Sequence, residues 1–143
     1  MSGLSGLLDG RVPPGVYAWR APVDPDGVRA AAEQAGWHVA RLDGRGHDDK
    51  ASVLAEMADA LDLPDWFGHN YDALADCLAD VGRGPSARLG TLLLWDGWDP
   101  FARADPGGFA TVLAILTERA ADRPPFAVLV RGDDPVPGLP GLD

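Results

Sequence analysis

The chain has 143 residues and a mass of 15.0 kDa, with 46% hydrophobic residues and five tryptophans. This composition is enough for the core of one domain and excludes an intrinsically disordered chain. The formal net charge of −10 argues against nucleic acid or an anionic membrane as direct partner and favours a basic protein. Cys77 is the single cysteine, so no intramolecular disulfide can form.

The first part of the chain predicts a strand, a helix and a second strand after a loose segment. Residues 1–15 are rich in Gly and Pro and are expected to be flexible. Val16–Arg20 has the composition of a short strand, and Val28–Ala35 is Ala-rich and helical, with Gly36 placed to end it. Trp37–Leu42 alternates apolar and polar residues, which is typical of a strand.

The middle of the chain predicts two helices. Asp48 or Asp49 can cap the first helix, which runs to about Leu61. The loop 65–69 follows, and Asn70 is suited to cap a second helix over residues 70–81.

The last part predicts two strands separated by a helix. Thr91–Trp95 is a nearly continuous apolar run, as expected of a strand covered on both faces. Asp105-Pro106 opens a helix with Pro at its first position, and Phe126–Val130 is a last apolar strand. The tail 132–143 is again rich in Pro and Gly and is expected to be flexible.

The alternation of strands and helices predicts the α/β class. We expect a small, mostly parallel sheet of three or four strands packed with helices, forming a single domain over residues 16–131. The strand and helix of 16–36 are expected to add a parallel edge strand beside 37–42, away from the helix 70–81.

The helix 70–81 carries a stripe of carboxylates. Asp72, Asp76 and Asp80 are four residues apart, so they share the face opposite the apolar residues. Like charges at this spacing destabilise an isolated helix by about 0.2–0.5 kcal/mol per pair. The placement indicates either a solvated face in an acidic protein or a functional surface.

Aromatic and acidic residues elsewhere extend this possible surface. Trp66 lies in the loop before the acidic helix, where an apolar anchor beside directed charge is typical of an interface hot spot. Glu118 and Asp122 end the last helix, although carboxylates at a helix C-terminus oppose its dipole. If both helices share a surface, it suits Arg, Lys and protonated His.

An enzymatic function has weaker support from the sequence than a binding function. His69, Asp72 and Asp76 could hold a divalent metal for hydrolysis, but H-x-x-D-x-x-x-D is a weak signal without a second histidine nearby. The sequence has neither a G-x-S-x-G nucleophile motif nor a G-x-x-x-x-G-K-[ST] phosphate loop. Cys77 lies on the apolar side of its helix, where thiols are usually inert.

The segment 63–80, LPDWFGHNYDALADCLAD, resembles the signature of the barstar family of ribonuclease inhibitors. The family pattern is Leu-Pro, any residue, two aromatics, Gly, any residue, Asn, any residue, Asp-Ala-Leu, any residue, Asp. The resemblance extends from about Trp37 to Arg131, and the preceding strand and helix are an addition that the smallest members lack.

The resemblance implies a cytoplasmic inhibitor, without catalytic activity, cofactor or metal, that binds a basic secreted microbial ribonuclease one to one. The residues implied to contact the nuclease are Trp66, Asn70, Tyr71, Asp72, Asp76, Glu118 and, less directly, Asp122. The absence of a basic start and a long apolar run at the N-terminus also favours the cytoplasm. The alternatives are a binder of another basic toxin or protein and the metal hydrolase described above.

The chain departs from the family's prototype at four positions of the acidic helix. Ala75 and Val81 stand where the prototype has Trp, Tyr71 where it has Leu, and Ala79 where it has Thr. We expect charge recognition to survive these changes while the identity of the nuclease differs.

Overall fold

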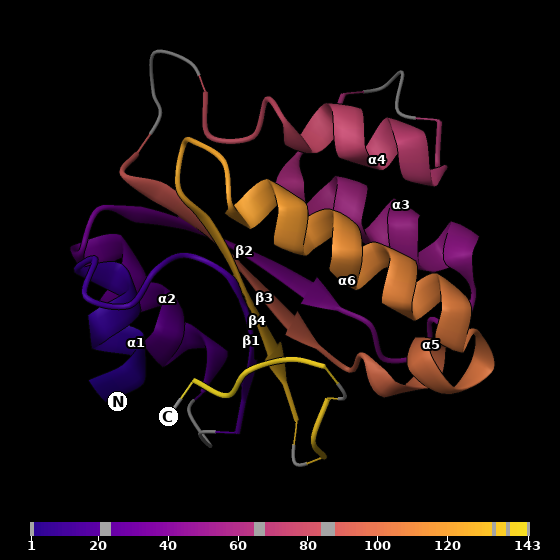
Figure 1. The fold of residues 1–143 in the computed structure, drawn as a ribbon, viewed down its shortest axis with the longest axis horizontal. Coiled ribbons are helices and arrows are strands. Elements are labelled where there is room, and N and C mark those ends of the chain that lie inside the picture. Colours follow the sequence, from indigo (N-terminus) through magenta and orange to yellow (C-terminus); the bar gives the residue numbers. More distant parts are fainter. Residues whose placement is uncertain are drawn as a thin grey trace.

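The centre of the molecule is a sheet of four parallel strands (Figure 1). The computed structural model describes residues 2–20, 24–64, 68–83, 88–132, 134–136 and 138–142. The strands are β1 (Val16–Trp19), β2 (Trp37–Asp43), β3 (Gly90–Asp96) and β4 (Phe126–Arg131), in the order β1-β4-β3-β2. The predicted α/β class and parallel sheet are confirmed.

Helices cover both faces of this sheet. They are α1 (Ser2–Leu8), α2 (Pro25–Gln34), α3 (Lys50–Leu61), α4 (Tyr71–Leu78), α5 (Asp99–Ala104) and α6 (Pro106–Ala120). The buried side chains of α1 and α2 pack on one face, and those of α3 to α6 pack on the other. We call these the α1/α2 face and the α4/α6 face; they lie on opposite sides of the strands in Figure 1.

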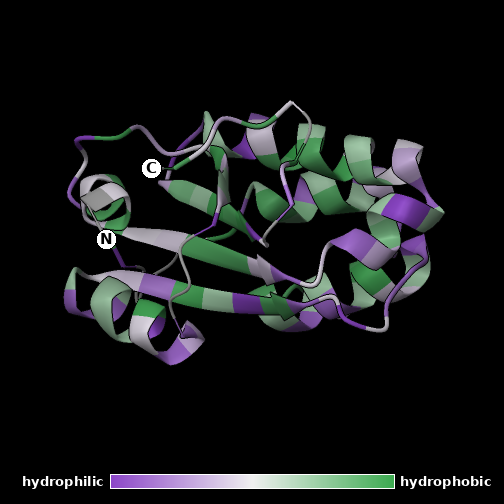
Figure 2. Ribbon diagram, turned by 90° about the horizontal axis from the view of Figure 1, so that it is seen from below, coloured by the Kyte–Doolittle hydropathy of each residue, from purple (hydrophilic) through white to green (hydrophobic). Residues whose placement is uncertain are grey.

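Burial along the strands follows their apolar patterns. The central strands β3 and β4 are buried at every position except their last residue, because helices cover them from both sides. The edge strand β2 exposes His38 and Arg41, and it shows as alternating hydrophilic and hydrophobic bands in Figure 2.

Three helices begin at the capping residues that the sequence predicts. The side chains of Asp49, Asn70 and Asp105 each accept a hydrogen bond from the backbone N–H three residues ahead, at 2.8, 2.8 and 2.9 Å. Each bond satisfies one of the amides left without a partner in the first turn of a helix. Because Asn70 caps α4, the start of the acidic helix is well defined.

Parts of both ends, which the sequence predicts to be flexible, form structure that packs on the sheet. Residues 2–8 form α1, whose Leu4 and Leu7 are each 1% exposed against the sheet. In the tail, Val136 and Leu142 are buried, and Gly141 forms a bridge with Ala18 of β1. Both ends are rich in Gly and Pro, but each also contains a few apolar residues. Burial of these residues outweighs the low intrinsic helix or strand propensity of the segments.

The predicted position of the added strand is also wrong. β1 is a parallel edge strand, but it pairs with β4 (Val16 with Val128) and not with β2. β1 and β2 therefore form opposite edges of the sheet, and α2 connects them across the face opposite α4. Local patterns predict that a strand forms, but they do not specify its distant partner. The expectation that the addition leaves the acidic helix uncovered holds for α2.

No helix in the described ranges combines the length and the apolar character that crossing a membrane requires.

Candidate protein-binding site

The acidic helix is shorter than the sequence predicts. α4 spans Tyr71–Leu78, with Leu74, Cys77 and Leu78 buried and Asp72 and Asp76 exposed one turn apart. Asp80 lies beyond the helix, in a turn where its N–H donates to the carbonyl of Cys77 at 3.2 Å. Two carboxylates, and not three, therefore project from the regular helix.

Two arginines donate hydrogen bonds to carbonyl oxygens at the end of α4. Arg119 of α6 donates from Nε to the carbonyl oxygen of Leu78 at 2.6 Å, and Arg83 donates from Nε to that of Ala79 at 2.8 Å. These carbonyls would accept backbone amides if the helix continued. Positive charge at a helix C-terminus also complements the dipole. α4 ends at Leu78, before Asp80.

The other end of α4 is fixed by Tyr71. Its ring is half-buried, and Nζ of Lys50, at the start of α3, lies 4.4 Å from the ring centroid. A Cβ on Gly108, in the first turn of α6, would lie only 2.7 Å from the Tyr71 hydroxyl, so this side chain also reaches α6. Burial and the charge of Asp105 raise the pKa of Tyr71. Tyr71, predicted as a contact residue, thus packs against the starts of both neighbouring helices.

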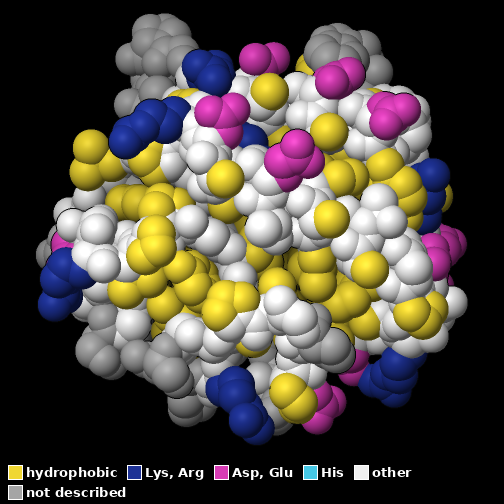
Figure 3. Space-filling model, viewed as in Figure 1, with side chains coloured by type: hydrophobic (Ala, Val, Ile, Leu, Met, Phe, Trp, Pro, Cys, Tyr) yellow, Lys and Arg dark blue, Asp and Glu magenta, His cyan; other side chains and the backbone are white. Residues whose placement is uncertain are grey.

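α6 lies beside α4, so the second acidic pair joins the first. A hollow of about 180 Å³ separates the two helices, and its lining residues are Ala75, Ala79, Ile115, Glu118, Arg119 and Asp122. Glu118 is exposed on α6, whereas Asp122 lies beyond the end of α6 and accepts a hydrogen bond from the N–H of Arg123 at 2.8 Å. Acidic side chains gather at the upper part of this face, over α4 and the adjoining end of α6 (Figure 3).

Sequence reasoning missed Arg119. A signal was present, because Arg119 follows Val112 and Leu116 at the spacing of the apolar stripe of α6. A charged residue on such a stripe is either paired in the core or displaced from it. Here it is 6% exposed and hydrogen-bonded to backbone oxygens.

Trp66, the predicted aromatic anchor, lies outside the described residues, as does Phe67. The structure therefore leaves the role of this loop as a prediction.

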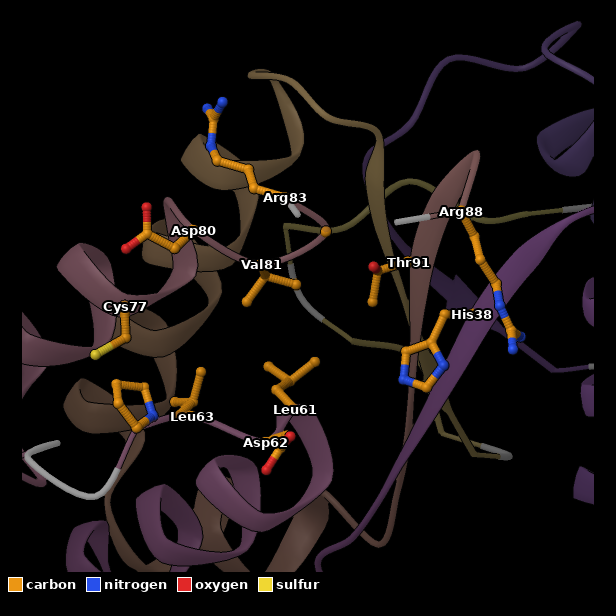
Figure 4. A pocket seen from close by; sticks show the side chains of 12 residues that line it. His38, Leu61, Asp62, Leu63, Cys77, Asp80, Val81, Arg83, Arg88 and Thr91 are labelled. Atoms are coloured by element: carbon orange, nitrogen blue, oxygen red, sulfur yellow. The ribbon is translucent and has the colours of Figure 1, made fainter. Parts of the chain in front are cut away.

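A cavity lies behind α4, between the end of this helix and β2 (Figure 4). Its volume is about 460 Å³, with Cys77 and Leu63 on one side and His38 and Arg88 on the other. Burial raises the pKa of the Cys77 thiol, and the carboxylates of Asp76 and Asp80 raise it further. The thiolate is therefore disfavoured, which makes Cys77 a poor nucleophile.

The candidate metal ligands do not form a site. His69, Asp72 and Asp76 all lie in the described ranges, and no group of three or more His, Cys, Asp or Glu side chains there is placed to hold a metal ion. His69 has a positive φ of 52° directly before the capping Asn70, so it forms the turn into α4.

These features define a small α/β domain that carries an exposed acidic surface on two adjacent helices. Comparison with protein-family models matches residues 37–131 to the family described as Barstar (barnase inhibitor), and the chain belongs to this family. The family consists of non-enzymatic inhibitors, so the protein is not an enzyme. The match starts at β2 and ends with β4, which leaves α1, β1 and α2 before it. A search of curated proteins finds no match.

Proposed function

We propose that this protein is an intracellular inhibitor of a secreted microbial ribonuclease of the barnase type, and that it blocks the active site of the enzyme with α4. Family membership supports the class of partner. The observation that carries the proposal is the pair of exposed carboxylates, Asp72 and Asp76, on a short helix secured at both ends. A net charge of −10 suits a basic enzyme.

In the proposed mechanism, Asp76 takes the place of a substrate phosphate. A ribonuclease holds the scissile phosphate with cationic side chains, and a carboxylate can form paired, charge-assisted hydrogen bonds with an arginine among them. Asp72 and Glu118 pair with neighbouring cations, and Trp66 covers a side chain of the nuclease. Asn70 contributes by capping α4, because its side-chain oxygen is occupied by the N–H of Ala73. The enzyme is blocked sterically, without any chemical step.

The hollow between α4 and α6 bears on which nuclease is bound. Ala75 and Ala79 form its α4 side, and Glu118 and Asp122 add carboxylates on the α6 side. Small residues here leave room that the partner must fill with its own side chain for a well-packed interface. This supports a nuclease whose surface differs from that recognised by the family's prototype.

The proposal is tested by measuring inhibition of a panel of secreted microbial ribonucleases by the purified protein. We expect one-to-one inhibition of at least one basic member, unchanged by a chelator, because no metal takes part. Binding of a basic protein without loss of ribonuclease activity would favour the alternative partner class. Failure to bind any member of a panel that includes barnase-type enzymes would contradict the proposal.

A further inference from the structure

The guanidinium of Arg119 is buried and is bonded to three backbone carbonyls in two segments. Nε donates to the Leu78 carbonyl at 2.6 Å, Nη2 to the Val81 carbonyl at 2.8 Å and Nη1 to the Pro124 carbonyl at 2.9 Å. Its Cζ lies 5.2 Å from the centroid of the Phe126 ring, at the start of β4. One rigid, planar group thus connects α6, the end of α4 and the segment that leads into β4.

The hydrogen bonds of Arg119 reach backbone oxygens only, and the described part of the chain shows no ion pair to it. Burying a charge without a close counter-ion is costly, and the cost is reduced here by the hydrogen bonds to backbone carbonyls. Burial lowers the pKa of Arg119, and Asp122 partly opposes that shift. Such an arrangement stabilises one particular geometry, because the bonds are lost if α4 moves.

The bonded groups are next to the proposed contact residues. Leu78 is two residues after Asp76 on α4, and Glu118 directly precedes Arg119 on α6. The guanidinium therefore sets the distance between the surfaces from which these two carboxylates project. An interface that is already in its bound arrangement avoids the cost of ordering when the partner arrives.

We propose that Arg119 is a positioning residue for inhibition: from inside the protein it holds α4 against α6, so that Asp76 and Glu118 are presented at a fixed spacing. This inference rests on the proposed function. Arg119 itself does not touch the partner. Substitution of Arg119 should mainly change the dissociation rate, because that rate depends on how well the contacts fit in the formed complex.

Charge alone predicts tighter binding when Arg119 is neutralised, whereas the proposal predicts weaker binding. Removing a positive charge from the acidic surface of an inhibitor should speed association with a basic enzyme. Arg83 supplies the matched control. It is exposed, and it joins the same two segments by donating to the carbonyls of Ala79 and Arg123 at 2.8 and 2.9 Å. Water can replace exposed bonds of this kind, so Arg83→Met should lose little organisation.

The experiment compares Arg119→Met with Arg83→Met against an inhibited ribonuclease, by stopped-flow association and by dissociation into excess competitor. Both variants should associate as fast as the wild type or faster. The Arg119→Met complex should dissociate about tenfold faster, the size expected when a residue acts through its neighbours. Rates are referred to the folded fraction of each variant, and Arg119→Lys, which keeps one donor group, should give an intermediate rate. Equal dissociation of the Arg119→Met and Arg83→Met complexes would overturn the proposal.

A second measurement uses the free protein and needs no nuclease. The amides of Asp80 and Val81 donate to Cys77 and Leu78 at the end of α4. Their hydrogen exchange should quicken, relative to α3, in the Arg119 variants and not in Arg83→Met. If Arg119→Met does not fold, Arg119→Lys replaces it in both measurements. If hydrogen exchange of these amides is unchanged in the Arg119 variants, the anchoring role is refuted, even if the wild type inhibits a ribonuclease. If the wild type binds no ribonuclease, the proposed function is refuted instead.

Discussion

The two faces of the sheet differ in what their helices leave exposed. On the α1/α2 face, Leu4, Val28 and Ala32 are buried against the strands, and this layer lies outside the family match. On the α4/α6 face, the helices bury an equally apolar side but also present Asp72, Asp76 and Glu118 to solvent. Under the proposed function, one face serves stability alone, while the other serves both stability and recognition. Substitutions should therefore separate the two properties.

The largest expected effect is on stability, from the α1/α2 face. Leu4→Ala should lower the free energy of unfolding by about 2–5 kcal/mol, because it removes a fully buried side chain and leaves a cavity. Leu8→Ala, at a partly buried position of the same helix, should cost less. Urea denaturation gives both values. The division between the faces would fail if Leu4→Ala weakened inhibition beyond its loss of folded protein.

The complementary change is Asp76→Ala on the α4/α6 face. It should weaken nuclease binding by at least about 2 kcal/mol, the usual threshold for a hot spot. Stability should be unchanged or slightly higher, because one like-charge pair with Asp72 is removed. Asp26→Ala on α2 changes the net charge equally and is the control. Similar inhibition by the two variants would contradict the assignment of Asp76.

The smallest expected effect is that of salt, which should change the association rate at the α4/α6 face more than it changes the stability of the fold. Association with a basic nuclease should slow as ionic strength rises from low to physiological, because screening shortens the range of attraction to the acidic surface. Dissociation should change much less, and so should the free energy of unfolding, which depends on apolar burial. Stopped-flow association that is flat over this range would argue against electrostatic steering.

Features set by local pattern could be predicted from the sequence. The apolar run 91–95 lies within β3, and the caps Asn70 and Asp105 mark the starts of α4 and α6, because a strand covered on both faces and a capped helix have short-range signatures. The exposed pair Asp72 and Asp76 followed from helical spacing alone.

Features set by distant contacts could not be predicted. β1 pairs with β4, which is more than 100 positions away along the chain, and no local pattern encodes that choice. The end of α4, before Asp80, is bonded to Arg119 of α6, a contact that the local pattern of residues 70–81 does not encode. The adjacency of Glu118 to α4 likewise depends on how two helices pack. The placement of Trp66 stays a prediction.

The bridge between the tail and β1 has a consequence for self-association. The N–H of Ala18 donates to the carbonyl of Pro140, and the N–H of Leu142 donates to the carbonyl of Ala18, each at 2.9 Å. These bonds occupy backbone groups at the outer edge of β1, while the opposite edge, β2, carries Arg41 and His38, whose polar side chains discourage strand addition. A shortened chain that lacks residues 140–142 would free Ala18 as a template for another strand. The tail thus covers the backbone groups at the outer edge of β1 to which an added strand would otherwise bond.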